Sequence, residues 1–202
     1  MKHREKIEIS ELDHEGEHYN ALVVDMDKGW KRGGNIGNNP EINSLCSYGF
    51  STCFAFIIIS KNSISLSHTS NPFKEEEQNN LQKEIDLHKK SDVNTIVIIG
   101  YNKNDYEEFM NELIAKEMNK RTKFSKKNLR ATFKDTVNKD VEEVTNKFKA
   151  KLIDLEQGTV IVGLSGKVIT SISGDEILYK TSFFQEPSAK TLRMKQNQEQ
   201  EL

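Results

Sequence analysis

The 202-residue sequence predicts an α+β fold, in which a mixed or antiparallel sheet core is flanked by amphipathic helices within a single domain. Short apolar runs rich in β-branched residues dominate roughly the first sixty residues and return near the C-terminus. Between them, apolar residues recur at helical spacing. The length suits one core of moderate size, which we place in residues 1–185, followed by a disordered tail at 186–202.

Apolar alternation, or a continuous β-branched run, marks each expected strand. These strands are Ile7–Ile9, Ala21–Val24, Phe54–Ser60, Ile64–His68, Thr95–Gly100, Thr159–Val162, Lys167–Thr170 and Ile177–Phe184. Gly163–Gly166 reads as the turn of a hairpin. The glycine- and asparagine-rich stretch Gly29–Pro40 is expected to be a long loop.

Three helices are expected in the middle of the chain. The first follows Asn71-Pro72 and has a narrow apolar face, and the second is capped by Asn104 or Asp105 and has a wide one. The third is capped by Asp140, continues through Leu155 and ends at Gly158. Between the second and third helices we expect a basic loop, residues 121–130, and a short strand, residues 131–133.

The composition excludes several classes of protein. Acidic and basic residues nearly cancel and are intermixed, so no concentrated basic surface for nucleic acid is expected. The longest apolar run, Phe54–Ile59, is too short to span a membrane, and Met1–Lys6 lacks the apolar region of a secretory signal. Two cysteines, Cys46 and Cys53, make neither a disulfide framework nor a zinc quartet. A cytoplasmic protein without metal or cofactor is expected.

Cys53 and His68 are the strongest candidates for chemistry. A turn of small residues, Ser47–Thr52, leads to Cys53 at the start of an apolar strand, and His68 ends the next strand. Neighbouring antiparallel strands place residues of modest separation side by side. A cysteine nucleophile needs an imidazole within hydrogen-bond reach, because the thiolate is the reactive form. This pattern predicts a cysteine–histidine site.

The segments Ser47–Cys53 and His68–Pro72 resemble the catalytic blocks of the chemoreceptor glutamine deamidases of bacterial chemotaxis. That family carries Thr-x-Gly-x-Gly-Ser-Cys before a strand, and a second strand that ends in histidine. Here Ser47-Tyr48-Gly49-Phe50-Ser51-Thr52-Cys53 is similar to the first block. The core is also similar to that of deamidating toxins of the cytotoxic-necrotizing-factor type. The resemblance covers about residues 45 to 172, and only the two short blocks are specific.

This resemblance implies a protein-glutamine deamidase in which Cys53, His68 and Ser47 form a catalytic triad. Serine replaces the family's threonine at 47 and its second glycine at 51, and the glycine-rich receptor-contact signature is absent. These departures favour a divergent effector or toxin over an enzyme of chemoreceptors. The implied partner is a glutamine-bearing protein, a host protein among the candidates, and the implied route into a host cell needs no signal peptide.

The implied chemistry is hydrolysis of a side-chain amide. Cys53 attacks the amide carbon, His68 transfers a proton to the leaving ammonia, and water hydrolyses the thioester. Ser47 would orient the imidazole through its hydroxyl or its backbone carbonyl, and backbone N–H groups at the Cys53 turn are candidates for stabilising the oxyanion. The alternatives are a non-catalytic interaction module with a buried, inert thiol, and a thiol protease or transglutaminase.

Three further motifs favour ordinary explanations. His14-Glu15-Gly16-Glu17-His18 matches the His-Glu-x-x-His zinc pattern, but it falls between two expected strands rather than on a helix. The glycine-rich stretch Gly33–Gly37 lacks the ending of a phosphate loop and favours a flexible loop, with a cover over the site as its functional alternative. The basic cluster Lys120–Lys127 favours a solvated face, with steering of an acidic substrate as its functional alternative.

Overall fold

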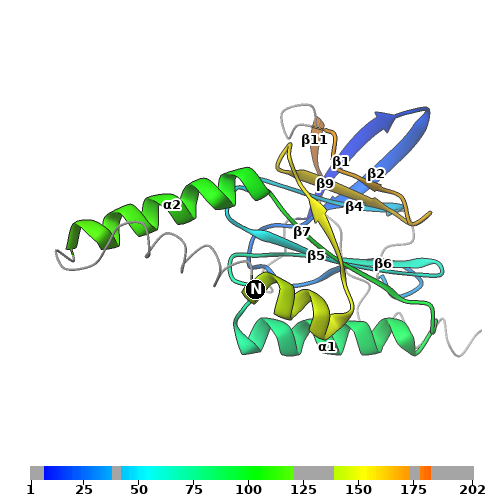
Figure 1. Cartoon of the computed structure of the whole chain (residues 1–202). Coiled ribbons are helices and arrows are strands. Elements are labelled where there is room, and N and C mark those ends of the chain that lie inside the picture. The colour runs from blue at the N-terminus through cyan, green and yellow to red at the C-terminus, as the bar shows by residue number, and fades with distance from the viewer. Residues whose placement is uncertain (1–6, 38–41, 121–138, 173–177, 183–202) are drawn as a thin grey trace, which may run out of the picture.

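A computed structural model of the chain describes residues 7–37, 42–120, 139–172 and 178–182. These described residues form two mixed sheets and three helices, which confirms the α+β class (Figure 1). Among the described residues, none of the helices combines the length and apolar character that crossing a membrane requires.

The larger sheet has six strands in the order β10-β9-β4-β2-β1-β11. Its strands are β1 (Ile7–His14), β2 (Glu17–Val23), β4 (Ser44–Tyr48), β9 (Thr159–Gly163), β10 (Val168–Ile169) and β11 (Leu178–Ser182). Neighbours are antiparallel except β2 and β4, which run parallel.

The smaller sheet has five strands in the order β3-β6-β5-β7-β8. Its strands are β3 (Lys31–Gly34), β5 (Phe54–Ser60), β6 (Ser63–Thr69), β7 (Ile96–Tyr101) and β8 (Lys151–Asp154). Only β7 and β8 pair in parallel. The expected strands Phe54–Ser60 and Ile64–His68 are present as β5 and β6, which pair antiparallel as neighbours in the chain.

The main core lies between the two sheets. Ala55 and Ile57 of β5 join Leu45 of β4 in this cluster, whereas Phe56 and Ile58 point to the opposite face of the smaller sheet. A strand buried on both faces needs apolar residues at every position. This explains the uninterrupted apolar run of β5.

Helices cover the outer face of the smaller sheet. Helix α1 (Glu75–Lys89) and a helix over residues 139–148 pack there, and α2 (Lys103–Lys120) projects from the body in Figure 1. The cap of α2 is Asn102, whose Oδ1 accepts a hydrogen bond from the N–H of Asp105 at 3.1 Å. The expectation of a cap at Asn104 or Asp105 was therefore wrong by two or three residues.

Two expected elements need correction. Part of the predicted Gly29–Pro40 loop is strand β3, which lies at the edge of the smaller sheet and pairs with β6. The predicted helix from Asp140 to Leu155 ends at residue 148, because Lys149 adopts a positive φ of 51° and the chain continues as β8 beside β7. The predicted loop at 121–130, strand at 131–133 and tail at 186–202 lie outside the described residues.

Candidate active site

The structure gathers Cys53, His68 and Ser47 where the two sheets face each other. Cys53 directly precedes β5, His68 lies in β6, and Ser47 lies in β4 of the other sheet. The register pairs Ala55 with His68, and Cys53 stands two residues before Ala55. Side chains alternate along a strand, so Cys53 and His68 share the inner face as diagonal neighbours.

Ser47 lies in a strand rather than in the expected turn of small residues. Strand β4 directs Leu45 and Ser47 into the space between the sheets and Cys46 to the outer face of the larger sheet. The turn itself spans Gly49–Cys53 and begins with a φ of 77° at Gly49, a conformation that favours glycine. Cys46 and Cys53 therefore belong to different apolar clusters.

The Ser47 hydroxyl bridges His68 and the backbone. Its Oγ lies 3.0 Å from Nδ1 of His68 and donates a hydrogen bond to the carbonyl of Val24 at 2.5 Å. A serine hydroxyl has a single proton, so it accepts at the other contact, and Nδ1 of His68 must be the donor. In this tautomer Nε2 of His68 carries the free lone pair of a base.

The remaining nitrogen of His68, Nε2, is buried and has no hydrogen-bond partner among the described residues. The His68 residue as a whole is 4% exposed. Burial lowers the pKa of His68 to about 4, although the nearby carboxylates of Asp27 and Asp25 act in the opposite direction. The imidazole is therefore neutral at physiological pH and available as a base.

The Phe50 ring fixes the plane of the imidazole. The Phe50 and His68 rings are stacked with centroids 4.0 Å apart. Phe50 is itself held by its N–H, which donates to the carbonyl of Gly158 at 3.1 Å. The ring of His68 is thus restrained by a hydrogen bond on one edge and by an aromatic face.

Cys53 is 7% exposed, and its thiol is in contact with Met26. Its S–H group points at Sδ of Met26 with a sulfur–sulfur distance of 3.3 Å. Burial raises the pKa of the Cys53 thiol, and the negative charge of Asp27 raises it further, whereas a hydrogen bond from Thr52 acts in the opposite direction. The expected hydrogen bond between Cys53 and His68 is absent, and the resting pair is thiol and neutral imidazole.

Asp27 joins the Met26 segment to the end of β6. Its N–H donates to the carbonyl of His68 at 2.8 Å, and its carboxylate accepts from the N–H of Ser70 at 3.0 Å. This hydrogen bond lowers the pKa of Asp27, so the carboxylate beside the thiol is ionised. Asp27 has a φ of 55°, a conformation that Asn and Asp tolerate better than most residues.

Two of the backbone N–H groups at the turn are already engaged. Phe50 donates to Gly158, and Ser51 donates to the carbonyl of Gly49 at 3.0 Å. The N–H groups of Thr52 and Cys53 are the remaining candidates for stabilising an oxyanion. A cavity of about 530 Å³ borders this turn, and its lining includes Gly49, Phe50, Ser51, Asn102, Asp105, Glu156 and Gln157.

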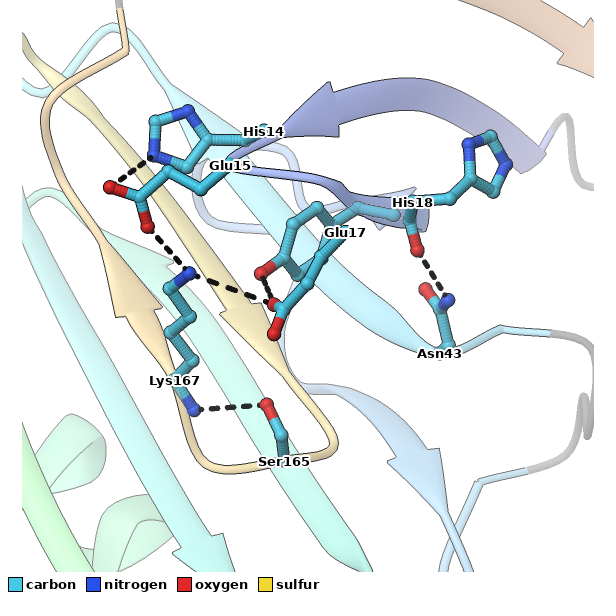
Figure 2. Close-up of polar contacts among 8 residues, drawn as sticks. His14, Glu15, Glu17, His18, Asn43, Ser165 and Lys167 are labelled. Atoms are coloured by element: carbon cyan, nitrogen blue, oxygen red, sulfur yellow. Dashed lines mark hydrogen bonds and ion pairs between the residues drawn. The ribbon is translucent and has the colours of Figure 1, made fainter.

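The zinc-like motif lies in the β1–β2 hairpin, as Figure 2 shows. Strand register pairs His14 with Glu17 and Asp13 with His18, so the two histidines occupy opposite faces of the hairpin. No group of three or more metal-binding side chains occurs within the described part of the chain. The motif does not have the geometry of a zinc protease.

The glutamates of this motif instead join two hairpins. Nζ of Lys167 lies 2.8 Å from a carboxylate oxygen of Glu15 and 3.7 Å from one of Glu17 (Figure 2). Glu15 and Gly16 form the turn, both with positive φ. The charged motif is an exposed contact with the β9–β10 hairpin.

Sequence patterns missed Met26, Asp27 and Phe50. Asp25-Met26-Asp27 looks like an ordinary polar segment, and the contacts that matter at the site, those of Met26 and Asp27, are with residues more than twenty positions away. Phe50 stands inside the turn that drew attention to Cys53, and a large aromatic in a turn of small residues was an available sign of packing.

Comparison with known proteins finds neither a matching family model nor a matching curated protein. The resemblance to glutamine deamidases is therefore an inference from the residues of the two short blocks alone.

Proposed function

We propose that the chain is a protein-glutamine deamidase that uses Cys53 as nucleophile, His68 as general base and acid, and Ser47 as the group that positions the imidazole. One observation carries this proposal. His68 is held at Nδ1 by Ser47, and its opposite nitrogen is buried, unpaired and on the sheet face that also carries Cys53. Leaving a buried nitrogen without a partner costs about 1–3 kcal/mol, which favours a role for that atom.

The reaction begins with neutral groups. As Sγ of Cys53 attacks the amide carbon of a glutamine, Nε2 of His68 takes the thiol proton. His68 then gives this proton to the leaving nitrogen, the carbon–nitrogen bond breaks and ammonia departs. A water molecule, deprotonated by His68, attacks the thioester, which yields glutamate and regenerates the thiol. The proposed reaction uses no metal ion or cofactor.

The pKa directions favour proton transfer during attack over a preformed ion pair. Burial raises the pKa of the Cys53 thiol and lowers that of His68, so both groups favour their neutral forms before substrate binds. His68 Nδ1–H keeps an acceptor in Ser47 throughout, and this contact stabilises the imidazolium that forms transiently.

The substrate of this proposal is a protein with an accessible glutamine, with host proteins as candidates for a secreted effector or toxin. Conversion of glutamine to glutamate changes the partner by one negative charge, a sufficient basis for regulation or toxicity. A thiol protease or transglutaminase would use the same groups. The cavity borders the turn that leads to Cys53, and in this proposal it takes a part of the substrate chain near the target residue.

A non-catalytic interaction module is the second candidate, favoured by the burial of Cys53 and the raised pKa of its thiol. Such a module needs no open nitrogen on His68 and makes no covalent intermediate.

Intact-mass spectrometry of candidate partner proteins tests the proposal. Incubation with the wild-type chain should add about one dalton per deamidated glutamine, and the Cys53→Ser variant should add none. A second incubation with methylamine separates transglutamination, which attaches the amine, from deamidation. Cleavage products would indicate a protease. Partners that bind without any mass change, across a panel that includes host proteins, would favour the interaction module.

A further inference from the structure

Met26 lies on the solvent side of the Cys53 thiol and contacts it. Met26 as a residue is 50% exposed, whereas Cys53 beneath it is 7% exposed. The two sulfur atoms lie 3.3 Å apart. A half-exposed side chain therefore lies directly against an almost fully buried thiol.

The covering side chain has the shape of the proposed substrate. Methionine and glutamine are both unbranched as far as the δ position, where methionine has its sulfur and glutamine has the amide carbon that Cys53 would attack. Reacting atoms in a productive complex lie about 3–3.5 Å apart. Sδ of Met26 is at such a distance, 3.3 Å, from Sγ of Cys53.

The backbone of Met26 is anchored, but its side chain is free to leave. Residue 26 forms an isolated parallel bridge with His68, and the next N–H, that of Asp27, donates to the carbonyl of His68. Methionine is unbranched and flexible. Because half of its surface already faces solvent, its side chain can rotate outward without crossing the core.

We propose that Met26 is an internal stand-in for the substrate glutamine: its side chain occupies the glutamine-binding position at Cys53 and must swing out before a protein substrate is deamidated. This inference rests on the proposed deamidase activity. In this assignment the unbranched side chain of the substrate glutamine binds where the Met26 side chain now lies against Cys53. Residue 26 then determines whether a substrate reaches the thiol.

The Met26→Gln variant tests the assignment directly, because it puts an amide at the position of Sδ. Cys53 should attack that amide, ammonia should leave with a proton from His68, and water should hydrolyse the thioester to leave a carboxylate at position 26. The purified chain should gain about one dalton at residue 26 without any partner, at a rate independent of protein concentration. The double variant Met26→Gln/Cys53→Ser should not gain this mass.

Alkylation of Cys53 by iodoacetamide tests the covering role without any deamidation. Met26→Ala should react on the order of tenfold faster than wild type, whereas Met26→Leu, which keeps a side chain of similar size, should remain slow. Peptide mapping distinguishes Cys53 from Cys46, which belongs to another apolar cluster. Equal alkylation rates for all three chains would overturn the inference.

The outcomes also separate this inference from the proposed function. An unchanged mass for Met26→Gln, combined with deamidation of a partner by the wild-type chain, would overturn the glutamine position at residue 26 and leave the activity intact. Faster alkylation of Met26→Ala with no deamidation of residue 26 or of any partner would refute both. A Cys53-dependent mass gain at residue 26 would support both.

Discussion

Replacing Ser47 by alanine removes a single hydroxyl that has two buried partners. Ser47 accepts from Nδ1 of His68 and donates to the carbonyl of Val24. Both Ser47 and His68 are almost completely buried, at 0% and 4% exposure, so water does not readily replace the hydroxyl. The variant would leave both nitrogens of His68 without a partner.

The magnitude follows from the cost of an unsatisfied buried donor, about 1–3 kcal/mol. At 1.36 kcal/mol per factor of ten, a loss of that size in the transition state lowers turnover roughly 5- to 150-fold. If the proton moves to Nε2 and the base nitrogen is lost, the effect approaches the factor of about 10⁴ known for a catalytic histidine in the wrong tautomer. The midpoint temperature of thermal unfolding should fall by roughly 2–4 °C for each kcal/mol of lost stability in a chain of this size.

The assay combines deamidation rates with the ¹⁵N NMR shifts of the His68 ring. Wild type should show Nδ1 protonated, and Ser47→Ala should lose that preference together with activity. Ser47→Thr keeps the hydroxyl and should retain the tautomer, at an overpacking cost of about 1–3 kcal/mol for one buried methyl group. Full activity of Ser47→Ala with an unchanged tautomer would refute the positioning role assigned to Ser47.

The remaining predictions concern the thiol, the base and pH. Cys53→Ser should abolish deamidation while Cys46→Ser leaves it unchanged; an essential Cys46 would contradict the site. His68→Ala should suppress turnover, whereas His14→Ala and added chelator should have no effect on the mass-spectrometric assay; metal dependence would revive a zinc site. Asp27→Asn removes a negative charge that raises the pKa of Cys53, so the pH profile of iodoacetamide alkylation should shift downward; an unshifted profile would exclude this coupling. The free energy of unfolding should fall as the pH is lowered from 6.5 to 4, because the pKa of His68 is about 4 in the folded chain and 6.5 in the unfolded chain. Urea titrations of the His68→Gln variant should show a weaker dependence on pH over the same range.

The strands around the site were accessible from sequence because their physical signals are local. The apolar run Phe54–Ser60 is buried on both faces, and a short polar turn connects it to the next strand. Antiparallel alternation then places Cys53 and His68 on one face. The prediction that Ser47 contacts His68 came from the resemblance of the two blocks, since no periodic pattern links residues in different sheets. That contact is present in the structure.

Elements stabilised by distant partners escaped prediction. Strand β3 contains two glycines and two cations, so its propensity favours a loop, but its backbone is paired to β6. Strand β8 looked like the last turn of a helix, because Leu152 and Leu155 are three residues apart. Backbone pairing with β7 determines its conformation instead. Met26 has no local pattern at all, since its importance comes from a contact with Cys53.

The two buried histidines of the described residues, His68 and His88, differ in a way that argues for a reactive site at His68. In His88, Nδ1 lies 2.7 Å from Oγ of Ser60 and Nε2 lies 2.8 Å from Oγ of Ser65, so both nitrogens have partners. This is the arrangement expected of a histidine whose role is packing, because each unsatisfied buried nitrogen destabilises the fold. In His68 only Nδ1 has a hydrogen-bond partner within the described part of the chain, namely Ser47. Nε2 has none there, and the His68 side chain lies on the sheet face that also carries Cys53. A fold that satisfies one buried histidine completely is capable of satisfying another, and the exception at His68 leaves a lone pair available where a thiol proton must be taken.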